Sequence, residues 1–415
     1  MRYLDTIIIG AGQAGLGMSH CLSGLGLDHV LLESGRVAER WRSGSWDSLR
    51  LLTPNWMTRL PGHAYRGDDP DGFMAASSFV RHLDAYALAA GAPVIADTRV
   101  MALEAEGAGY RAVTERGAFH APTVVIATGA CGEPAVPAMA DALTPGIVQV
   151  TPASYRNPAL LPEGGVLVVG ASSSGVQIAD EIHRSGRPVT IAAGRHTRLP
   201  RSYRGRDITW WLDRIGILDE RHDAVHDIAA ARRQPSLQLI GSPERRNLGL
   251  PELMLCGVRV VGRLRAVEGH RLHFDTDAAR TVQAADEKMH GVLDRIDAHI
   301  IRRGLDRMVE AASRPTPGLP AEGPSTIDLK AEGIAAVVWA TGYRRDYAWL
   351  RLPVLDEHGE LRHDGGIVSR PGLYALGLRF MRRRKSSFID GVGPDATELA
   401  AHLAAYLRGG FRIAA

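Results

Sequence analysis

The sequence predicts an α/β fold in which one strand–turn–helix–strand unit occurs twice, once near residue 10 and once near residue 170. In the first copy, the apolar run Leu4–Ile9 is typical of a strand that is buried on both faces. The turn Gly10-Ala11-Gly12-Gln13-Ala14-Gly15 follows, residues 15–25 have helical apolar spacing, and His29–Glu33 is a second short strand. A βαβ unit of this length with glycines in its first turn indicates a Rossmann-like dinucleotide-binding domain.

The second copy has the same order of elements. Val166–Val169 is the first strand, Gly170-Ala171-Ser172-Ser173-Ser174-Gly175 is the turn, residues 176–185 are the helix, and Val189–Ala192 is the next strand. Two such units in one chain imply two dinucleotides, so the repeat is more informative than either turn alone.

The glycines of the first turn have separate roles. Gly10 permits the tight turn out of the strand, Gly12 lets the backbone approach a pyrophosphate, and Gly15 lets helix and strand pack closely. The start of the helix then offers free N–H groups and a positive dipole end to the phosphates. Glu33 ends the next strand, where a carboxylate can accept hydrogen bonds from ribose hydroxyls.

The second turn has Ser172 in place of the middle glycine, and its small hydroxyl can donate a hydrogen bond to phosphate. No acidic residue ends the following strand; Gly194-Arg195 stands there instead. A carboxylate would repel a 2′-phosphate, whereas an arginine binds one through charge-assisted hydrogen bonds. The second dinucleotide is therefore expected to be NADP(H) rather than NAD(H), with Arg198 and Arg201 extending the same clamp.

The tripeptide Ala-Thr-Gly follows an apolar strand twice, at Ala127-Thr128-Gly129 and at Ala340-Thr341-Gly342. A glycine at such a strand end lets the backbone pass close to a ligand or between domains. Because the repeat accompanies two nucleotide loops, we expect both tripeptides to lie near a cofactor or a domain crossing.

Elsewhere the pattern is simpler. Residues 75–90, 285–303 and 396–407 are predicted helices, and residues 258–274 contain a hairpin-like stretch.

The formal net charge of +3 is small, which argues against nucleic acid or a membrane surface as a partner. Three widely spaced cysteines argue against a disulfide framework and for a cytoplasmic location, and the absence of a CxxC pair argues against a redox dithiol.

Taken together, these residues resemble the two-dinucleotide-binding flavoproteins. Within them they look most like the class B flavin-dependent monooxygenases, the flavin-containing, N-hydroxylating and Baeyer–Villiger group. The resemblance also rests on residues 41–62 with their Trp-Asp-Ser-Leu-Arg-Leu-Leu-Thr-Pro core, on Ala-Thr-Gly-Tyr at 340–343, and on SSFIDGVGPDA at 386–396.

This resemblance implies an FAD domain with an NADP domain inserted in it: residues 1–155 and 315–415 for FAD, and 156–314 for NADP. It also implies that NADPH reduces the flavin, that O2 then gives a C4a-(hydro)peroxyflavin, and that one oxygen atom passes to a small organic substrate. No protein nucleophile is required, and the sequence has no Ser-His-Asp, HExxH or clustered Cys/His pattern, so no metal is predicted. The expected cofactor-binding residues are Gly10, Gly12, Gln13, Ala14, Gly15, Glu33, Trp41, Arg50, Thr53, Thr128, Gly129, Gly170, Ser172, Ser173, Ser174, Gly175, Arg195, Arg201, Thr341, Gly342, Asp390 and Val392.

Two positions differ from the family pattern and supply the candidate catalytic residues. Thr151 stands where the family has a histidine before Tyr-Arg-Asn-Pro. Leu52 stands where the family often has an asparagine, and Asn55 follows three residues later. Asn55 and Thr151 are therefore the residues on which the oxygen chemistry is expected to depend.

Three alternatives remain open at this point. The chain could be an NADPH oxidase or reductase that makes peroxide without oxygen transfer, or a flavin dehydrogenase with another electron acceptor. It could also be a non-catalytic FAD-bound regulator, with the basic run Arg382-Arg383-Arg384-Lys385 as a docking patch or, alternatively, as a solvated face or a phosphate contact.

Overall fold

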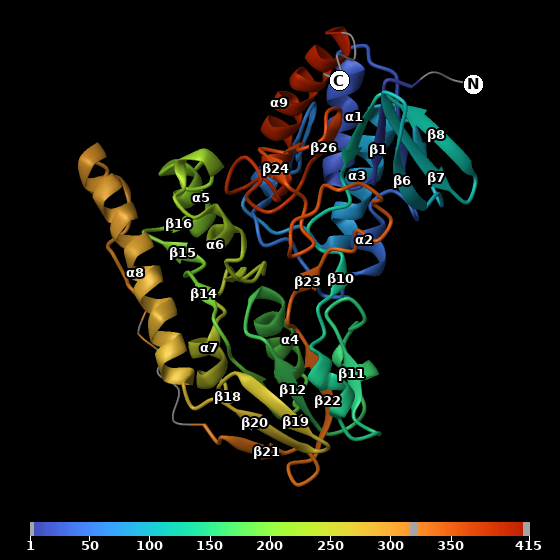
Figure 1. Ribbon diagram of the computed structural model, residues 1–415. Helices are drawn as coiled ribbons and strands as arrows, with labels where there is room; N and C mark the ends of the chain where they lie inside the picture. The colour runs from blue at the N-terminus through green and yellow to red at the C-terminus, as the bar shows by residue number, and fades with distance from the viewer. Residues whose placement is uncertain (1–3, 316, 318–322, 410–415) are drawn as a thin grey trace.

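The computed structural model describes residues 4–315, 317 and 323–409 and contains two largely parallel sheets, each with helices around it (Figure 1). This confirms the α/β fold with two dinucleotide-binding domains. The glycine-rich turns lie where they were predicted, between a buried strand and a helix in each domain.

The first sheet has seven strands in the order β24-β25-β26-β9-β1-β2-β5. The pairs β24–β25 and β25–β26 are antiparallel and the other pairs are parallel. The strands are β1 (Thr6–Ile9), β2 (His29–Leu32), β5 (Val94–Ile95), β9 (Thr123–Ile126), β24 (His363–Asp364), β25 (Ile367–Val368) and β26 (Leu373–Ala375). Every residue of β1, β2 and β9 is buried, as expected for apolar strands in the middle of a covered sheet.

Helix α1 (Gln13–Gly24) follows β1, and α9 (Ile389–Arg408) from the other end of the chain lies beside it (Figure 1). Gly17 permits this close packing, since a Cβ there would lie 2.6 Å from a methyl carbon of Val392. The remaining elements of this domain are α2 (Glu39–Ser43), η1 (Asn55–Met57), β3 (Arg59–Leu60), β4 (His63–Ala64), α3 (Ala76–Ala89), β6 (Val100–Glu106), β7 (Gly109–Thr114) and β8 (Gly117–Ala121).

The second sheet has five parallel strands in the order β11-β22-β12-β13-β18. These are β11 (Val148–Val150), β12 (Gly165–Val169), β13 (Val189–Ala192), β18 (Arg259–Val261) and β22 (Ile334–Trp339). The helices and short strands of this domain are α4 (Ser173–Arg184), α5 (Ile208–Arg214), α6 (Ile228–Arg232), α7 (Leu250–Leu255), α8 (Ala278–Arg303), β14 (Thr197–Arg198), β15 (Ser202–Tyr203), β16 (Arg206–Asp207), β17 (Leu237–Gln238), β19 (Leu264–Glu268), β20 (Arg271–Phe274) and β21 (Thr326–Asp328). Strands β19 and β20 form the predicted hairpin.

The strand pairing moves the predicted domain boundaries. Residues 148–150 and 334–339 were assigned to the FAD domain, yet both are strands of the second sheet. The chain crosses between the domains instead at β10 (Glu133–Pro134) and returns at β23 (Tyr343–Arg344), and these two strands pair antiparallel in the middle of the molecule (Figure 1). Each crossing follows an Ala-Thr-Gly tripeptide, which is the place where the sequence analysis expected a ligand or a domain crossing.

Two predicted helices begin earlier than expected. Helix α8 starts at Ala278 rather than 285, and α9 starts at Ile389 rather than 396. The second difference arises because Pro394, which has no N–H to donate, lies inside the helix near its start. Asp390 and Val392 thus belong to the first turn of α9.

Candidate functional site

Both glycine-rich turns have the same backbone geometry. Gly10 has φ +105° and Gly170 has φ +109°, values that favour glycine. A Cβ on Gly15 would lie 1.9 Å from the carbonyl oxygen of Gly10, and a Cβ on Gly175 would lie 1.9 Å from that of Gly170. The third glycine of each turn is therefore required by packing alone.

The first glycine of each turn meets an Ala-Thr-Gly segment of its own sheet. A Cβ on Gly10 would lie 2.7 Å from the carbonyl oxygen of Ala127, and a Cβ on Gly170 would lie 2.3 Å from that of Ala340. Thr128 and Thr341 are exposed beside these contacts, and the Thr341 hydroxyl donates to the carbonyl of Ala135 at 2.7 Å. Gly129 (φ +83°) and Gly342 (φ +98°) then turn the chain toward the other domain.

The helix starts that follow the turns suit phosphate groups. A Cβ on Gly12 would have nothing within 4 Å, so the backbone of the N-cap of α1 faces open space. Ser172, the N-cap of α4, makes no side-chain capping bond, which leaves its hydroxyl free for a ligand. Ser173 is instead engaged, because its hydroxyl accepts from the Gln177 amide at 3.0 Å. Both helix N-termini therefore fit the pyrophosphate of a dinucleotide.

Glu33 directly follows β2, which ends at Leu32, and its carboxylate also stabilises the turn. Oε2 accepts a hydrogen bond from the backbone N–H of Ala11 at 2.7 Å, and Oε1 accepts one from Gly35 at 3.1 Å. A carboxylate has about four acceptor sites, so it can also bind a ribose hydroxyl. Trp41 lies beside the same turn, where its indole N–H donates to Gln13 at 3.2 Å.

The arginines predicted to bind a 2′-phosphate divide into two groups. Arg195 is exposed, and no carboxylate of the described residues forms an ion pair with it. Arg198 is buried and forms an ion pair with Asp286. Arg201 is 0% exposed and bonds to the Leu52 carbonyl and to Asp207, so its expected place in the clamp is wrong.

Another arginine joins Arg195 at the carboxyl end of the second sheet. Strand β18 pairs with β13, and Gly262-Arg263 follows β18 as Gly194-Arg195 follows β13. The Arg263 side chain lies 3.9 Å from the Cβ position of Gly194 and has no ion pair within the described part of the chain. Arg263 was not predicted from the sequence, although the repeated Gly-Arg dipeptide after two strands was a signal for it.

The segment after α2 carries Arg50, Thr53 and Asn55. Asn55 is buried; its side-chain N–H donates to the carbonyl of Asp69 at 2.9 Å, while its buried Oδ1 has no hydrogen-bond partner among the described residues. Such an orphaned acceptor fits an N–H group of a bound cofactor. Thr53, which follows Leu52 in the chain, is half-buried.

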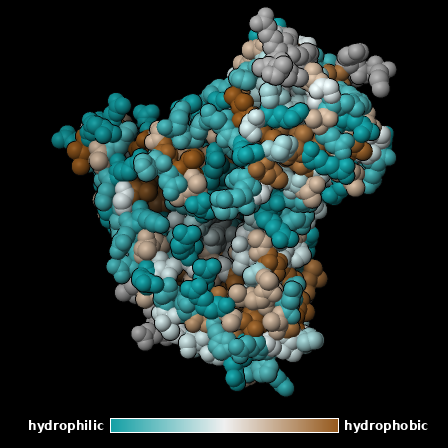
Figure 2. Space-filling view, viewed as in Figure 1, coloured by the Kyte–Doolittle hydropathy of each residue, from teal (hydrophilic) through white to brown (hydrophobic). Residues whose placement is uncertain are grey.

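Arg50 lines a pocket of about 220 Å³ between the two domains. Among the other residues around it are Trp46, Gln177, Asp180, Ile240 and Arg246. The face of the molecule in Figure 2 is likewise hollowed between the domains, and most of its surface is hydrophilic.

Thr151 lies at the carboxyl end of β11. Its amide donates to the Ser154 hydroxyl at 2.9 Å, and its carbonyl accepts from the amides of Ser154 and Tyr155. Within the described residues no hydrogen bond joins Thr151 to Asn55. The turn continues to Tyr155, whose hydroxyl donates to Glu181 at 3.0 Å, and burial raises the pKa of Glu181.

The first turn of α9 is held by charge. The Asp390 carboxylate accepts from Arg59 at 2.6 Å and from Lys385 at 3.0 Å, and Lys385 also lies 3.1 Å from Asp219 of the second domain. Asp390 is thus occupied by protein partners, and Val392 is fully buried against α1.

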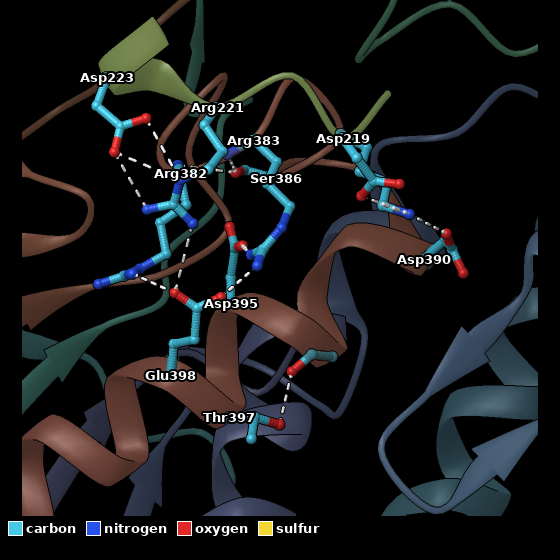
Figure 3. Close-up of polar contacts among 12 residues, drawn as sticks. Asp219, Arg221, Asp223, Arg382, Arg383, Ser386, Asp390, Asp395, Thr397 and Glu398 are labelled. Carbon is cyan, nitrogen blue, oxygen red and sulfur yellow. Dashed lines mark hydrogen bonds and ion pairs between the residues drawn. The ribbon is translucent and has the colours of Figure 1, made fainter. Parts of the chain in front are cut away.

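The basic run 382–385 is not a free surface. Figure 3 shows Arg382 and Arg383 directed at Glu398 and Asp395 of α9. Arg384 forms an ion pair with Glu220. Three backbone hydrogen bonds also join the run to the second domain. The N–H groups of residues 384 and 385 donate to the carbonyls of residues 220 and 218, and the N–H of residue 222 donates to the carbonyl of residue 382. The docking patch predicted for a regulator is therefore wrong; the run connects the domains.

The chain matches known proteins over most of its length. Residues 7–212 match the family described as pyridine nucleotide-disulphide oxidoreductase. An uncharacterized CzcO-like oxidoreductase of Geobacillus kaustophilus is 30% identical over 399 residues, which are 95% of this chain and 97% of that protein. The chain belongs to the CzcO-like oxidoreductase family.

Other relatives of this oxidoreductase are monooxygenases. The indole-3-pyruvate monooxygenase YUCCA4 of rice is 25% identical over 418 residues, covering 95% of this chain and 85% of that protein. The flavin-containing monooxygenase from Stenotrophomonas maltophilia shares its fold, with a TM-score of 0.69, 20% identity, and coverage of 98% of this chain and 100% of that one. Members of these families use FAD and NADPH, which agrees with two dinucleotide loops in one oxidoreductase.

Proposed function

We propose that this oxidoreductase is an NADPH-dependent FAD monooxygenase that transfers one oxygen atom from O2 to a small organic substrate. The observation that carries the proposal is the pair of matching glycine turns, each set against its own Ala-Thr-Gly crossing. The crossings bring the carboxyl ends of two nucleotide-binding sheets toward one another, as hydride transfer between two dinucleotides requires. The monooxygenase relatives and the absence of CxxC favour oxygen transfer over disulfide reduction.

We assign FAD to the first turn and NADPH to the second. Gly12 and the start of α1 would hold the FAD pyrophosphate, with Glu33 on the ribose. Ser172 and the start of α4 would hold the NADPH pyrophosphate. Arg195 and Arg263 would bind its 2′-phosphate, because both are exposed at adjacent strand ends and neither forms an ion pair with a carboxylate of the described ranges.

A reduced flavin supplies the reaction with oxygen, and the residues of the chain orient the reactants and exclude water. Asn55 offers its buried Oδ1 as an acceptor toward the cofactor. Thr151 takes a different part, because it shapes the turn that leads from β11 to Tyr155.

The partners in this proposal are a small substrate and O2, in the cytoplasm, without nucleic acid or membrane. None of the helices in the described ranges is long and apolar enough to cross a bilayer.

Stopped-flow mixing of the NADPH-reduced protein with O2 tests the proposal. We expect NADPH to bleach the flavin, and O2 then to produce a transient absorbance band that belongs to neither oxidised nor reduced flavin. Direct return to oxidised flavin with one peroxide per NADPH would make the protein an oxidase. A flavin that NADPH does not bleach would contradict NADPH dependence, and would leave a regulator or a dehydrogenase with another reductant.

A further inference from the structure

Arg201 belongs to the second domain but bonds to the first domain beside the proposed flavin site. It lies between β14 and β15, and its Nη1 donates to the carbonyl oxygen of Leu52 at 2.8 Å. Nη2 donates to Asp207 at 2.7 Å, and the guanidinium lies 4.9 Å from the centre of the Phe73 ring. One side chain therefore joins Leu52 and Phe73 of the first domain to the start of α5.

The burial of this arginine is costly. Its side chain is fully buried, its Nε has no partner, and burial lowers its pKa. A buried ion pair is often no more stabilising than apolar residues of the same volume. The stability of the fold therefore does not explain why an arginine stands at this position. A requirement for a fixed geometry at Leu52 does explain it.

The two groups to which Arg201 bonds, Asp207 and the Leu52 carbonyl, are each held in place by other contacts. Asp207 caps α5 and accepts bonds from the amide and the hydroxyl of Thr209, at 2.8 and 2.6 Å. On the other side, the segment that contains Leu52 is held by the backbone N–H groups of Leu51 and Asn55, which donate to the carbonyls of residues 74 and 72. Gly241 of the second domain packs closely against the same segment, since a Cβ there would lie 2.1 Å from the Leu51 carbonyl oxygen.

We propose that Arg201 is a positioning residue that sets the segment from Leu52 to Asn55 relative to the second domain. This inference rests on the proposed function, which places that segment beside the flavin and NADPH on the second domain. Arg201 then determines how the flavin ring and the nicotinamide face one another. A lysine cannot replace it, because a single ammonium lacks the planar fork that reaches Leu52 and Asp207 together.

The test compares Arg201→Lys with Arg204→Lys. Arg204 is a matched control, because it is a mostly buried arginine of the same region that pairs with Asp306 at 3.0 Å and makes no bond to the described residues of the first domain. We expect Arg201→Lys to retain FAD, to change the visible circular dichroism of the bound flavin, and to slow flavin reduction at saturating NADPH by roughly ten- to a hundredfold. Its dissociation constant for NADPH should stay near that of the wild type, since Arg195 and Arg263 are untouched. Arg204→Lys should match the wild type throughout.

A second variant tests the same segment if Arg201→Lys does not fold. Gly241→Ala would push on the Leu51 carbonyl without removing a charge, and we expect the same change in dichroism and reduction rate. Spectra and reduction rates that equal those of Arg204→Lys in both variants would overturn the inference. These readouts precede any reaction with O2, so a wild type that reduces its flavin but transfers no oxygen would contradict the monooxygenase proposal alone. A wild type that holds no flavin would overturn both.

Discussion

Adjacent arginines of the basic run are expected to differ strongly in their contribution to stability. Arg383 pairs with Asp395, whose side chain is 0% exposed, and with Glu398. Arg384 pairs with Glu220, and these side chains are 29% and 35% exposed. The substitutions Arg383→Met and Arg384→Met make the same chemical change at consecutive positions.

The expected costs follow from burial. Without Arg383 the Asp395 carboxylate stays buried and loses its ion-pair partner, and breaking a buried pair costs about 3–5 kcal/mol. Exposed pairs contribute about 0–1 kcal/mol, so Arg384→Met should be nearly neutral. With a urea m-value of about 3 kcal/mol per M, the midpoint should fall by roughly 1–1.7 M for Arg383→Met and by about 0.3 M or less for Arg384→Met.

Urea titration followed by tryptophan fluorescence measures both midpoints. Burial raises the pKa of Asp395 above 3.8, so ionising this group lowers stability as pH rises above that value. Because Arg383 offsets part of this loss, the penalty of Arg383→Met should be larger at about pH 8 than at about pH 5. Equal midpoint shifts for the two variants, or a penalty that grows as pH falls, would refute the reasoning.

Three further predictions concern the proposed NADPH arginines, the first glycine turn and a half-buried histidine. Arg195→Ala and Arg263→Ala should each raise the KM for NADPH by about tenfold or more, because each removes a charged hydrogen bond to the 2′-phosphate. The KM for NADH should change little. Equal effects on the KM values of both coenzymes would contradict the proposed 2′-phosphate site. Gly12→Ala should lower FAD content without moving the urea midpoint of the flavin-free protein, whereas Gly15→Ala should lower that midpoint, since its Cβ would lie 1.9 Å from a backbone oxygen. Burial lowers the pKa of His82 from 6.5 to about 4, so the wild type should lose stability as pH falls below about 6.5, and His82→Gln should flatten that part of the stability–pH profile.

The parts of the site that could be predicted from the sequence are those whose partners are near in the chain or repeated in it. The glycine turns are local, since Gly10 and Gly15 meet within one turn of strand and helix. Glu33 completes the same βαβ unit. The second Ala-Thr-Gly was informative because it repeats the first. In each case a short pattern sufficed.

The residues whose roles were mispredicted or missed make contacts with residues that are far away in the sequence. Arg201 was taken for a phosphate ligand because the sequence does not show that Leu52 lies against it, 149 positions away. Arg384 meets Glu220 across 164 positions, so a run of four basic residues gave no sign that carboxylates neutralise it. Arg263 joins Arg195 only because β18 pairs with β13.

The crossing at β10 and β23 also has a consequence for the order of folding. The residues between these paired strands form a continuous stretch, so every strand of the second sheet has been synthesised once residue 339 has been added to the chain. The first sheet is different, because β26 pairs with β9 and α9 packs on α1. Its central strands, made at the start of synthesis, must wait for the last 50 or so residues before their apolar edge is covered. During translation the amino-terminal half is therefore the aggregation-prone part, although it is synthesised first.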